Sequence, residues 1–374
     1  MKKLFTLLLA FVMVLGLVSI AGASPEKKTL GFYADNVDSY YVAISDVLKA
    51  LAEADPEVDW EINVVTGTGS AAEQLNAVQN FIQTGYDAIA VIQNNVETTS
   101  ECIQFTTDAG IPYIGLTHSF ASAPNATDAL AFIGFDFVQE GLYAGEDAYK
   151  WGAKKVVNVE GVLGQGTAGA QSYGFILGYT NAGADIGDWN DAEEWAAQKN
   201  SGMAGGEGLQ LYWSSGGWMK DAAKTQMANI ITELGPSGFD GVYAQNNPML
   251  EGVVEAMEEA GLDTKDYWIG SGNGREISWN WVREGVTDMD VNQSALLEGE
   301  ALYQILKAHF AGEEHRKYIH PYFNYYHTGN IEEIWDSLIP FTDVEAYLTK
   351  RAAGDIVYDI NNTEYWKDVP EFNK

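Results

Sequence analysis

The sequence FDGVYAQNNPMLEGVVEAMEEAG, residues 239–261, predicts one strand, one polar turn and one helix. Val242 to Ala244 form a short apolar run, as in the buried strand of a parallel sheet. Pro248 suits the first turn of a helix with Asn247 as its cap, and apolar residues then recur at helical spacing. Ligands of open α/β sheets bind outside the carboxyl ends of the strands. The Gln-Asn-Asn amides at this turn therefore indicate a site for a neutral polar ligand.

The same pattern occurs earlier in the chain. Residues 87–95, DAIAVIQNN, again form an apolar run that ends in Gln-Asn-Asn. Each copy is followed by a similar tripeptide, Tyr-Ile-Gly at 113–115 and Trp-Ile-Gly at 268–270. This repeated order predicts two similar α/β domains that face each other, and 374 residues give room for both.

The first 23 residues have the pattern of a secretory signal peptide. Lys2 and Lys3 precede an apolar run, and Ala21-Gly22-Ala23 offers a cleavage site of small residues. An uncleaved membrane anchor is the alternative. The single cysteine, Cys102, lies in a predicted helix and cannot carry a lipid at the cleavage site. We expect a soluble mature protein in the periplasm or outside the cell.

The chain is strongly acidic, with 53 Asp and Glu residues against 21 Lys and Arg residues and a formal net charge of −32. Such a surface repels the phosphate backbone of nucleic acids and anionic membranes. We therefore expect no nucleic-acid partner, and a soluble monomer.

Strands and helices alternate along most of the chain, which predicts parallel sheets with right-handed crossovers. The fold class is α/β, with two doubly wound parallel-sheet domains. Residues 183–208 break the alternation with tryptophans, acidic residues and glycines, and we interpret them as an insertion.

Residues 28–326 resemble periplasmic sugar-binding proteins of the ribose-binding type, which serve ABC importers. The most specific match is YAQNNPM at 243–249, close to FAQNDEM in that family. The resemblance implies two lobes joined by a hinge of three segments, which cross near residues 134–135, 293 and 322–323, with a sugar held between the lobes. The first lobe would comprise residues 24–134 and 294–322. The second would comprise 135–293 and 323–374, including a C-terminal extension. Lactose-repressor-type regulators share this fold, but they carry a DNA-binding helix pair where this chain has its predicted signal peptide.

The resemblance also implies a set of ligand-binding residues. Asp38, Tyr40, Tyr41, Trp218, Asn246 and Gln293 match family positions. Three positions depart from the family pattern: Thr117-His118 replaces an Asp-Arg pair, Gln171 stands nearest to a missing arginine, and Asn273 replaces an aspartate. Taken alone, an aromatic residue in a loop more often covers the hydrophobic core than binds a sugar. Asn246 taken alone could merely cap its helix.

These departures predict the charge of the ligand. Aromatic rings pack on the apolar faces of a sugar, and planar polar groups pair with its hydroxyls. With both arginines absent and Asp38 the one clear charge left among these positions, a carboxylate or phosphate on the ligand would be buried without a cation. We expect a small neutral carbohydrate, passed to an ABC transporter permease. Two alternatives stay open: the tryptophans of 183–208 line an enlarged cleft that admits a disaccharide, or the protein senses a non-sugar ligand.

A dinucleotide-dependent enzyme is the rival hypothesis. Residues 164–169 read G-x-G-x-x-G after a predicted strand and before a helix, as a secreted NAD-dependent oxidoreductase would require. The acidic residue expected at the end of the next strand is absent, because that strand ends in Tyr212-Trp213. The chain also lacks the G-x-S-x-G and H-E-x-x-H motifs and any recognised zinc spacing. We expect no catalytic residues, no cofactor and no metal.

Overall fold

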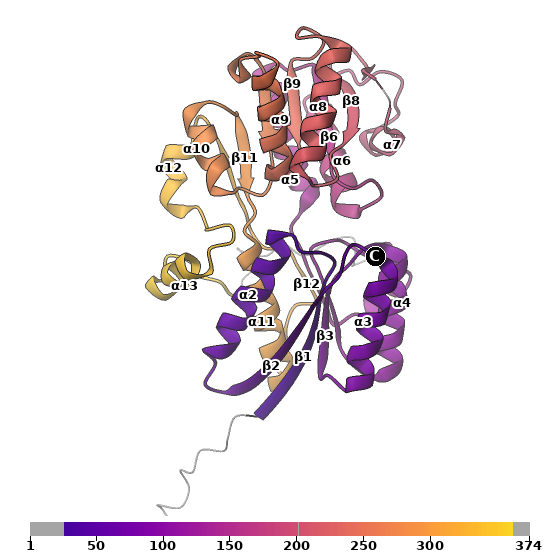
Figure 1. Ribbon diagram of the computed structural model, residues 1–374, viewed down its shortest axis with the longest axis vertical. Coiled ribbons are helices and arrows are strands. Elements are labelled where there is room, and N and C mark those ends of the chain that lie inside the picture. The colour runs from indigo at the N-terminus through magenta and orange to yellow at the C-terminus, as the bar shows by residue number, and fades with distance from the viewer. Residues whose placement is uncertain (1–25, 201, 362–374) are drawn as a thin grey trace, which may run out of the picture.

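A computed structural model describes residues 26–200 and 202–361, and the predicted signal peptide lies outside the described residues. Two lobes lie one above the other, each with a central sheet covered by helices (Figure 1). The expected α/β class with two parallel-rich sheets is confirmed.

The N-terminal lobe contains a six-stranded parallel sheet in the order β12-β5-β4-β3-β1-β2. Its strands are β1 (Glu26–Ala34), β2 (Val58–Thr66), β3 (Ala88–Ile92), β4 (Tyr113–Leu116), β5 (Ala131–Ile133) and β12 (Tyr318–Ile319). Its helices are α2 (Ser39–Glu53), α3 (Ala71–Thr84), α4 (Val96–Ala109), η1 (Ala126–Asp128) and α11 (Ala295–Ala311). Because α2 and α11 cover one face and α3 and α4 the other, each face of the sheet carries its own apolar core.

The C-terminal lobe contains a seven-stranded sheet in the order β13-β11-β10-β9-β6-β8-β7, antiparallel at its two edges. Its strands are β6 (Lys155–Glu160), β7 (Ala204–Gly205), β8 (Gln210–Ser215), β9 (Gly241–Ala244), β10 (Trp268–Ser271), β11 (Met289–Asn292) and β13 (Asn324–His327). Its helices are α5 (Phe137–Trp151), α6 (Gly166–Asn181), α7 (Ala192–Gln198), α8 (Lys220–Leu234), α9 (Asn247–Glu259), η2 (Thr264–Asp266), α10 (Glu276–Glu284), α12 (Ile331–Ile334) and η3 (Trp335–Ser337). This sheet too is covered on both faces.

The strand, turn and helix expected at residues 239–261 are β9 and α9. The helix cap, however, is one residue earlier than expected. The Oδ1 atom of Asn246 accepts a hydrogen bond from the backbone nitrogen of Met249 at 2.9 Å, so Asn247 is already the first residue of the helix. The first turn nevertheless contains Pro248, as expected.

The chain passes between the lobes at residues 134–136, 293–294 and 320–323, near the three expected hinge segments. It passes a fourth time at residues 338–343, and α13 (Val344–Ala353) lies beside α2 of the N-terminal lobe (Figure 1). Tyr347, Ile356 and Tyr358 belong to the same core as α2 and α11. The extension therefore packs on the first lobe, whereas the sequence analysis placed it with the second. An amphipathic pattern shows that one face of a helix is buried, but not against which surface.

The insertion at residues 183–208 packs against the C-terminal lobe. Trp195 is fully buried next to Leu209 and Leu211, and its ring stacks on Trp189 with centroids 6.1 Å apart. Neither tryptophan lines the cavity between the lobes. The alternative in which they enlarge the ligand cleft is therefore wrong.

None of the helices within residues 26–200 and 202–361 combines the length and apolar character that a membrane span needs.

Candidate functional site

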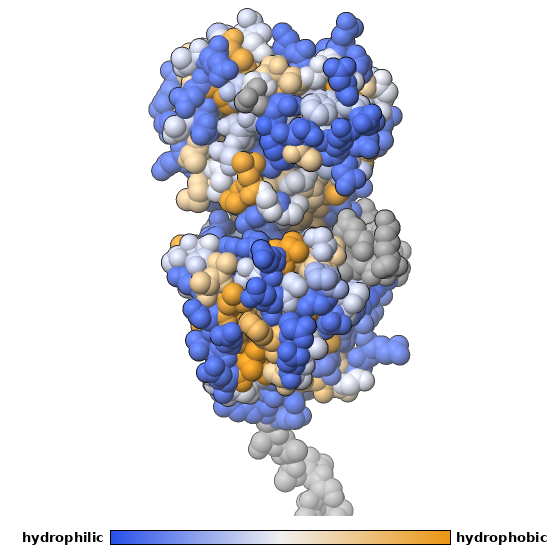
Figure 2. Space-filling view, turned by 90° about the vertical axis from the view of Figure 1, so that its right-hand side faces the viewer, coloured by the Kyte–Doolittle hydropathy of each residue, from blue (hydrophilic) through white to orange (hydrophobic). Residues whose placement is uncertain are grey.

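A cavity of about 620 Å³ lies between the two lobes, at the carboxyl ends of strands from both sheets. Figure 2 shows the waist between the lobes on a face that is mostly hydrophilic. All ten residues that the sequence analysis named as ligand-binding candidates line this cavity: Asp38, Tyr40, Tyr41, Thr117, His118, Gln171, Trp218, Asn246, Asn273 and Gln293. The volume suits a ligand the size of a sugar.

The first turn of α2 supplies two tyrosines to the N-terminal wall. Asp38 caps this helix by accepting a hydrogen bond from the backbone nitrogen of Tyr40 at 2.8 Å. The Tyr40 hydroxyl donates to Oε1 of Glu298 at 2.7 Å, and the Tyr41 hydroxyl pairs with Nε2 of His118 at 2.7 Å. Because both hydroxyls are engaged within the lobe, the tyrosines have mainly ring surface left for a ligand.

His118 joins the two lobes as a neutral group. Its Nδ1 atom lies 2.7 Å from Oγ1 of Thr167, which belongs to α6 of the C-terminal lobe. Burial lowers the pKa of His118 to about 4, so the ring carries no charge near neutral pH. His118 therefore does not replace the charge of the arginine found at this position in the family that the sequence resembles.

Trp218 forms the opposite wall on a turn after β8. Its backbone adopts φ +65°, and its ring lies against Gly161, where a Cβ atom would overlap the ring. Its Nε1 atom donates to Oε1 of Gln165 at 2.6 Å, which fixes the orientation of the ring. Trp218 thus presents a held aromatic surface to the cavity.

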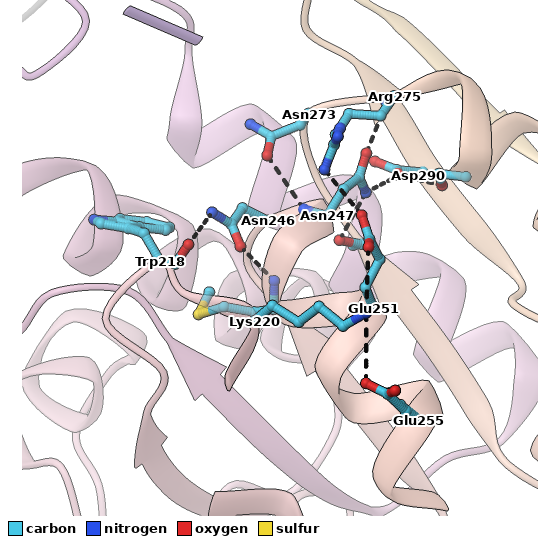
Figure 3. Close-up of polar contacts among 12 residues, drawn as sticks. Trp218, Lys220, Asn246, Asn247, Glu251, Glu255, Asn273, Arg275 and Asp290 are labelled. Carbon is cyan, nitrogen blue, oxygen red and sulfur yellow. Dashed lines mark hydrogen bonds and ion pairs between the residues drawn. The ribbon is translucent and has the colours of Figure 1, made fainter. Parts of the chain in front are cut away.

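The amide of Asn246 is largely used within the protein. Its Oδ1 atom caps α9, and its Nδ2 atom donates to the backbone oxygen of Trp218 at 3.2 Å (Figure 3). The side chain of Asn273 accepts a hydrogen bond from the backbone nitrogen of Asn247 at 3.2 Å. The alternative role stated for Asn246, that of a helix cap, accounts for the contact of its Oδ1 atom but not for that of its Nδ2 atom.

Two glutamines present acceptors without partners. Gln171 and Gln293 are each 2% exposed and line the cavity. Their Nε2 atoms donate to Oε1 of Glu140 at 2.6 Å and to the Tyr40 hydroxyl at 3.2 Å, while their Oε1 atoms accept no hydrogen bond from any described residue. Both oxygens are themselves fully buried, so they have no partner in the structure and do not contact the open cavity.

The structure adds two charges to the cavity that the sequence analysis missed. Asp35 follows directly after β1, and Arg275 lies in the turn before α10, two residues beyond Asn273. Asp38 is thus the one charge among the ten candidate positions but not the one charge at the cavity. The sequence offered one signal for both residues, because each of them follows a strand of a parallel-rich sheet. The guanidinium of Arg275 is itself paired, because its Nη1 atom lies 2.9 Å from Oε1 of Glu251 (Figure 3).

Phe341 is a further lining residue that sequence reasoning missed. It comes from the fourth crossing segment, and its ring centroid lies 5.6 Å from that of Tyr40. No local pattern links Phe341 to the site, because its position depends on where the C-terminal extension packs.

Glu298, beneath the N-terminal wall, gives the fold a pH dependence. It is fully buried, its oxygens accept from Tyr40 and Thr117, and burial raises its pKa to about 8. A carboxyl group with a raised pKa in the folded state stays protonated there while it ionises in the unfolded state. Between about pH 4.5 and pH 8 the folded state therefore binds more protons, and this group makes stability fall as pH rises.

We expect Glu298→Gln to remove this dependence. Relative to the variant, the wild-type free energy of unfolding should fall by up to ~1.4 kcal/mol per pH unit between about pH 5 and 8, the limit for one proton. Urea unfolding at several pH values measures the difference, with the exposed Glu284→Gln as the matched control. Parallel pH profiles for wild type and Glu298→Gln would contradict the assignment.

Comparison with known proteins agrees with the fold. A model of the periplasmic binding protein domain matches residues 32–314. The chain is 24% identical to the galactofuranose-binding protein YtfQ of Escherichia coli K12 over 294 aligned residues. The alignment covers 76% of this chain and 82% of that protein.

Solved structures with the same fold include a galactofuranose-binding protein, with a TM-score of 0.70, 21% identity, and 83% of this chain and 98% of that chain covered. A solute-binding protein of an ABC transporter from Bacillus halodurans C-125 was solved with bound myo-inositol. Its TM-score is 0.68 at 21% identity, and the match covers 84% of this chain and 98% of that chain. The family model covers most of the chain and both lobes. The protein therefore belongs to the periplasmic binding protein domain family, whose members are solute-binding proteins and not enzymes.

Proposed function

We propose that this protein captures a small sugar or sugar-like polyol without an anionic group in the cavity between its lobes and delivers it to an ABC importer. The observation that carries the proposal is the cavity of about 620 Å³ between the lobes, lined by the aromatic residues Tyr40, Tyr41 and Trp218 and by several side-chain amides. A sugar ring offers apolar faces to the aromatic rings and hydroxyl donors to the amide oxygens.

Named relatives support the class of ligand. The E. coli relative is named for galactofuranose, and two of the similar structures are described with galactofuranose and myo-inositol. These molecules share a small ring that carries several hydroxyl groups. We further propose a monomer that acts in the periplasm or outside the cell and hands its ligand to a permease.

The charges at the cavity support the exclusion of anions. Arg275 is neutralised by Glu251, while Asp35 and Asp38 would repel a ligand carboxylate or phosphate. The sequence analysis expected a neutral ligand, and these charges support the part of that expectation that excludes an anion.

A thermal-shift screen tests the proposal. The panel contains neutral sugars, cyclic polyols, sugar acids, sugar phosphates and amino acids, with NAD and ATP as nucleotides expected to be silent. A ligand present at 100 times its Kd should stabilise the fold by roughly 2.7 kcal/mol. Stabilisation by a sugar acid or phosphate, with every polyol silent, would contradict the proposal.

We expect Trp218→Ala to weaken binding of the best ligand from this screen by roughly 1–3 kcal/mol, because one aromatic face of the cavity is lost. Calorimetric titration measures the change. Trp151→Ala is the matched control, since Trp151 is 43% exposed at the carboxyl end of α5, while Phe137 at the amino end of that helix lines the cavity. Equal affinity of Trp218→Ala and wild type would remove Trp218 from the site.

Asn246→Ala is a less selective probe than the sequence suggested. It removes the cap of α9 as well as a cavity-lining amide, so stability should also fall, by about 1 kcal/mol. Affinity and unfolding must be measured together for this variant.

A further inference from the structure

The charges that line the cavity are not balanced. Arg275 is paired with Glu251, and Lys220 lies 3.7 Å from Glu251 and 3.4 Å from Glu255, so the cations at this edge of the C-terminal lobe already have acidic partners (Figure 3). On the opposite wall, Asp35 and Asp38 form no ion pair with any described residue. Burial raises the pKa of both carboxyl groups, and the charge of Arg275 offsets part of this rise for Asp38.

The helix behind Asp38 offsets only part of this negative charge. Asp38 caps α2, and the amino end of a helix carries about half a positive charge. Asp35 adds a second carboxylate that is 3% exposed, and its Oδ1 atom accepts a hydrogen bond from Nδ2 of Asn94 at 3.1 Å. The N-terminal wall thus remains negative.

Hydrogen-bonding capacity beside the two carboxyl groups is unbalanced in the same direction. The second carboxylate oxygen of Asp35 and of Asp38 has no hydrogen-bond partner among the described residues. Unused donors remain on the amides of Asn36, Gln165 and Asn273 and on the guanidinium of Arg275, of which only Nη1 is engaged by a described residue. A donor group of the ligand therefore fits best against Asp35 and Asp38.

We propose, on the basis of the function proposed above, that the preferred ligand is a polyol bearing a protonated amine, with its ammonium group against Asp35 and Asp38. A hydroxyl group offers one donor together with two acceptors, whereas an ammonium group offers three donors, no acceptor and the missing positive charge. Charge-assisted hydrogen bonds to carboxylates are also stronger than neutral ones. The hydroxyl groups of the same ligand bind the side-chain amides of Asn36, Gln165 and Asn273, which line the cavity.

Matched ligand triplets test this inference. Each triplet contains a neutral sugar, its amino sugar and the N-acetylated amino sugar, for example glucose, glucosamine and N-acetylglucosamine, with the galactose and mannose series alongside. Titration calorimetry at about pH 6.5 keeps the amines protonated. In at least one series the amino sugar should bind ten or more times more tightly than both of its neutral counterparts.

The variants Asp38→Asn and Asp35→Asn test whether these two carboxylates cause the preference for the amino sugar. Asparagine caps a helix as well as aspartate does and keeps the side-chain shape, so α2 should stay intact. Both variants should lose most of the preference for the amine while affinity for the neutral sugars changes less. Asp46→Asn, on the exposed side of α2, removes the same charge away from the cavity and should leave the preference unchanged.

The possible failures are distinguishable. If neutral sugars bind and no amino sugar is preferred, or if the preference persists in both aspartate variants, the ammonium inference is wrong and the proposed function stands. If no polyol of any kind binds, the proposed function and the inference both fail.

Discussion

Replacing Lys199 with methionine is expected to lower the free energy of unfolding by about 3 kcal/mol, because it leaves a buried carboxylate without its cation. Glu160, at the end of β6, is 1% exposed, and its Oε2 atom lies 2.6 Å from Nζ of Lys199 and accepts from the Ser172 hydroxyl at 2.6 Å. Lys199 comes from the insertion, and its ammonium lies 4.3 Å from the centre of the Trp213 ring. The insertion thus neutralises a charge buried in the lobe.

Two further variants distinguish the loss of the buried Lys199–Glu160 ion pair from the loss of a surface cation. Lys150→Met removes a cation whose side chain is 70% exposed and lies 3.8 Å from Glu146, so its cost should stay below about 1 kcal/mol. Glu160→Gln combined with Lys199→Met removes both charges and should recover much of the loss. Urea unfolding measures all four proteins. A Lys199→Met variant as stable as Lys150→Met would show that Glu160 does not depend on this ion pair.

Gly145→Ala is expected to destabilise the protein by roughly 1–3 kcal/mol, because helices α5 and α6 pack with their backbones in contact. A Cβ atom on Gly145 would overlap the backbone oxygen of Phe175, and one on Gly174 would overlap the backbone oxygen of Val138. Neither obstacle is the end of a flexible side chain, so the helices themselves would have to move apart.

Gly169 provides the control within the same helix pair. It lies in α6, and a Cβ atom added to it would meet no neighbouring atom within 4 Å. A helical glycine costs about 1 kcal/mol relative to alanine, so Gly169→Ala should be neutral or stabilising in the same unfolding experiment. If both substitutions had the same effect, close packing at Gly145 would not be the cause.

The sequence was sufficient to predict the strands and helices that build the site. Residues 239–261 fold as expected because local signals agree there: a buried apolar run, a proline in the first helical turn and helical spacing of the apolar residues. All ten candidate residues line one cavity because parallel strands bring their carboxyl ends to the same edge. Whether those residues contact a ligand stays a prediction.

The features that the sequence analysis missed depend on contacts between distant segments. The C-terminal extension was assigned to the wrong lobe because its partners on α2 and α11 lie far away in the chain. Trp189 and Trp195 looked available for a ligand, but they stack on each other against the core. The neutralisation of Arg275 depends on Glu251, one helix away. Such pairings become visible only when the fold brings the segments together.

Closure of the two lobes over a small polyol is tested most directly by small-angle X-ray scattering with and without the best ligand from the thermal-shift screen. The lobes are joined by the crossing segments and enclose the cavity between them, so hinge bending is the motion that would trap a ligand. At a ligand concentration shown by calorimetry to saturate the site, the radius of gyration should decrease. A radius of gyration that stays the same on saturation would contradict capture by closure.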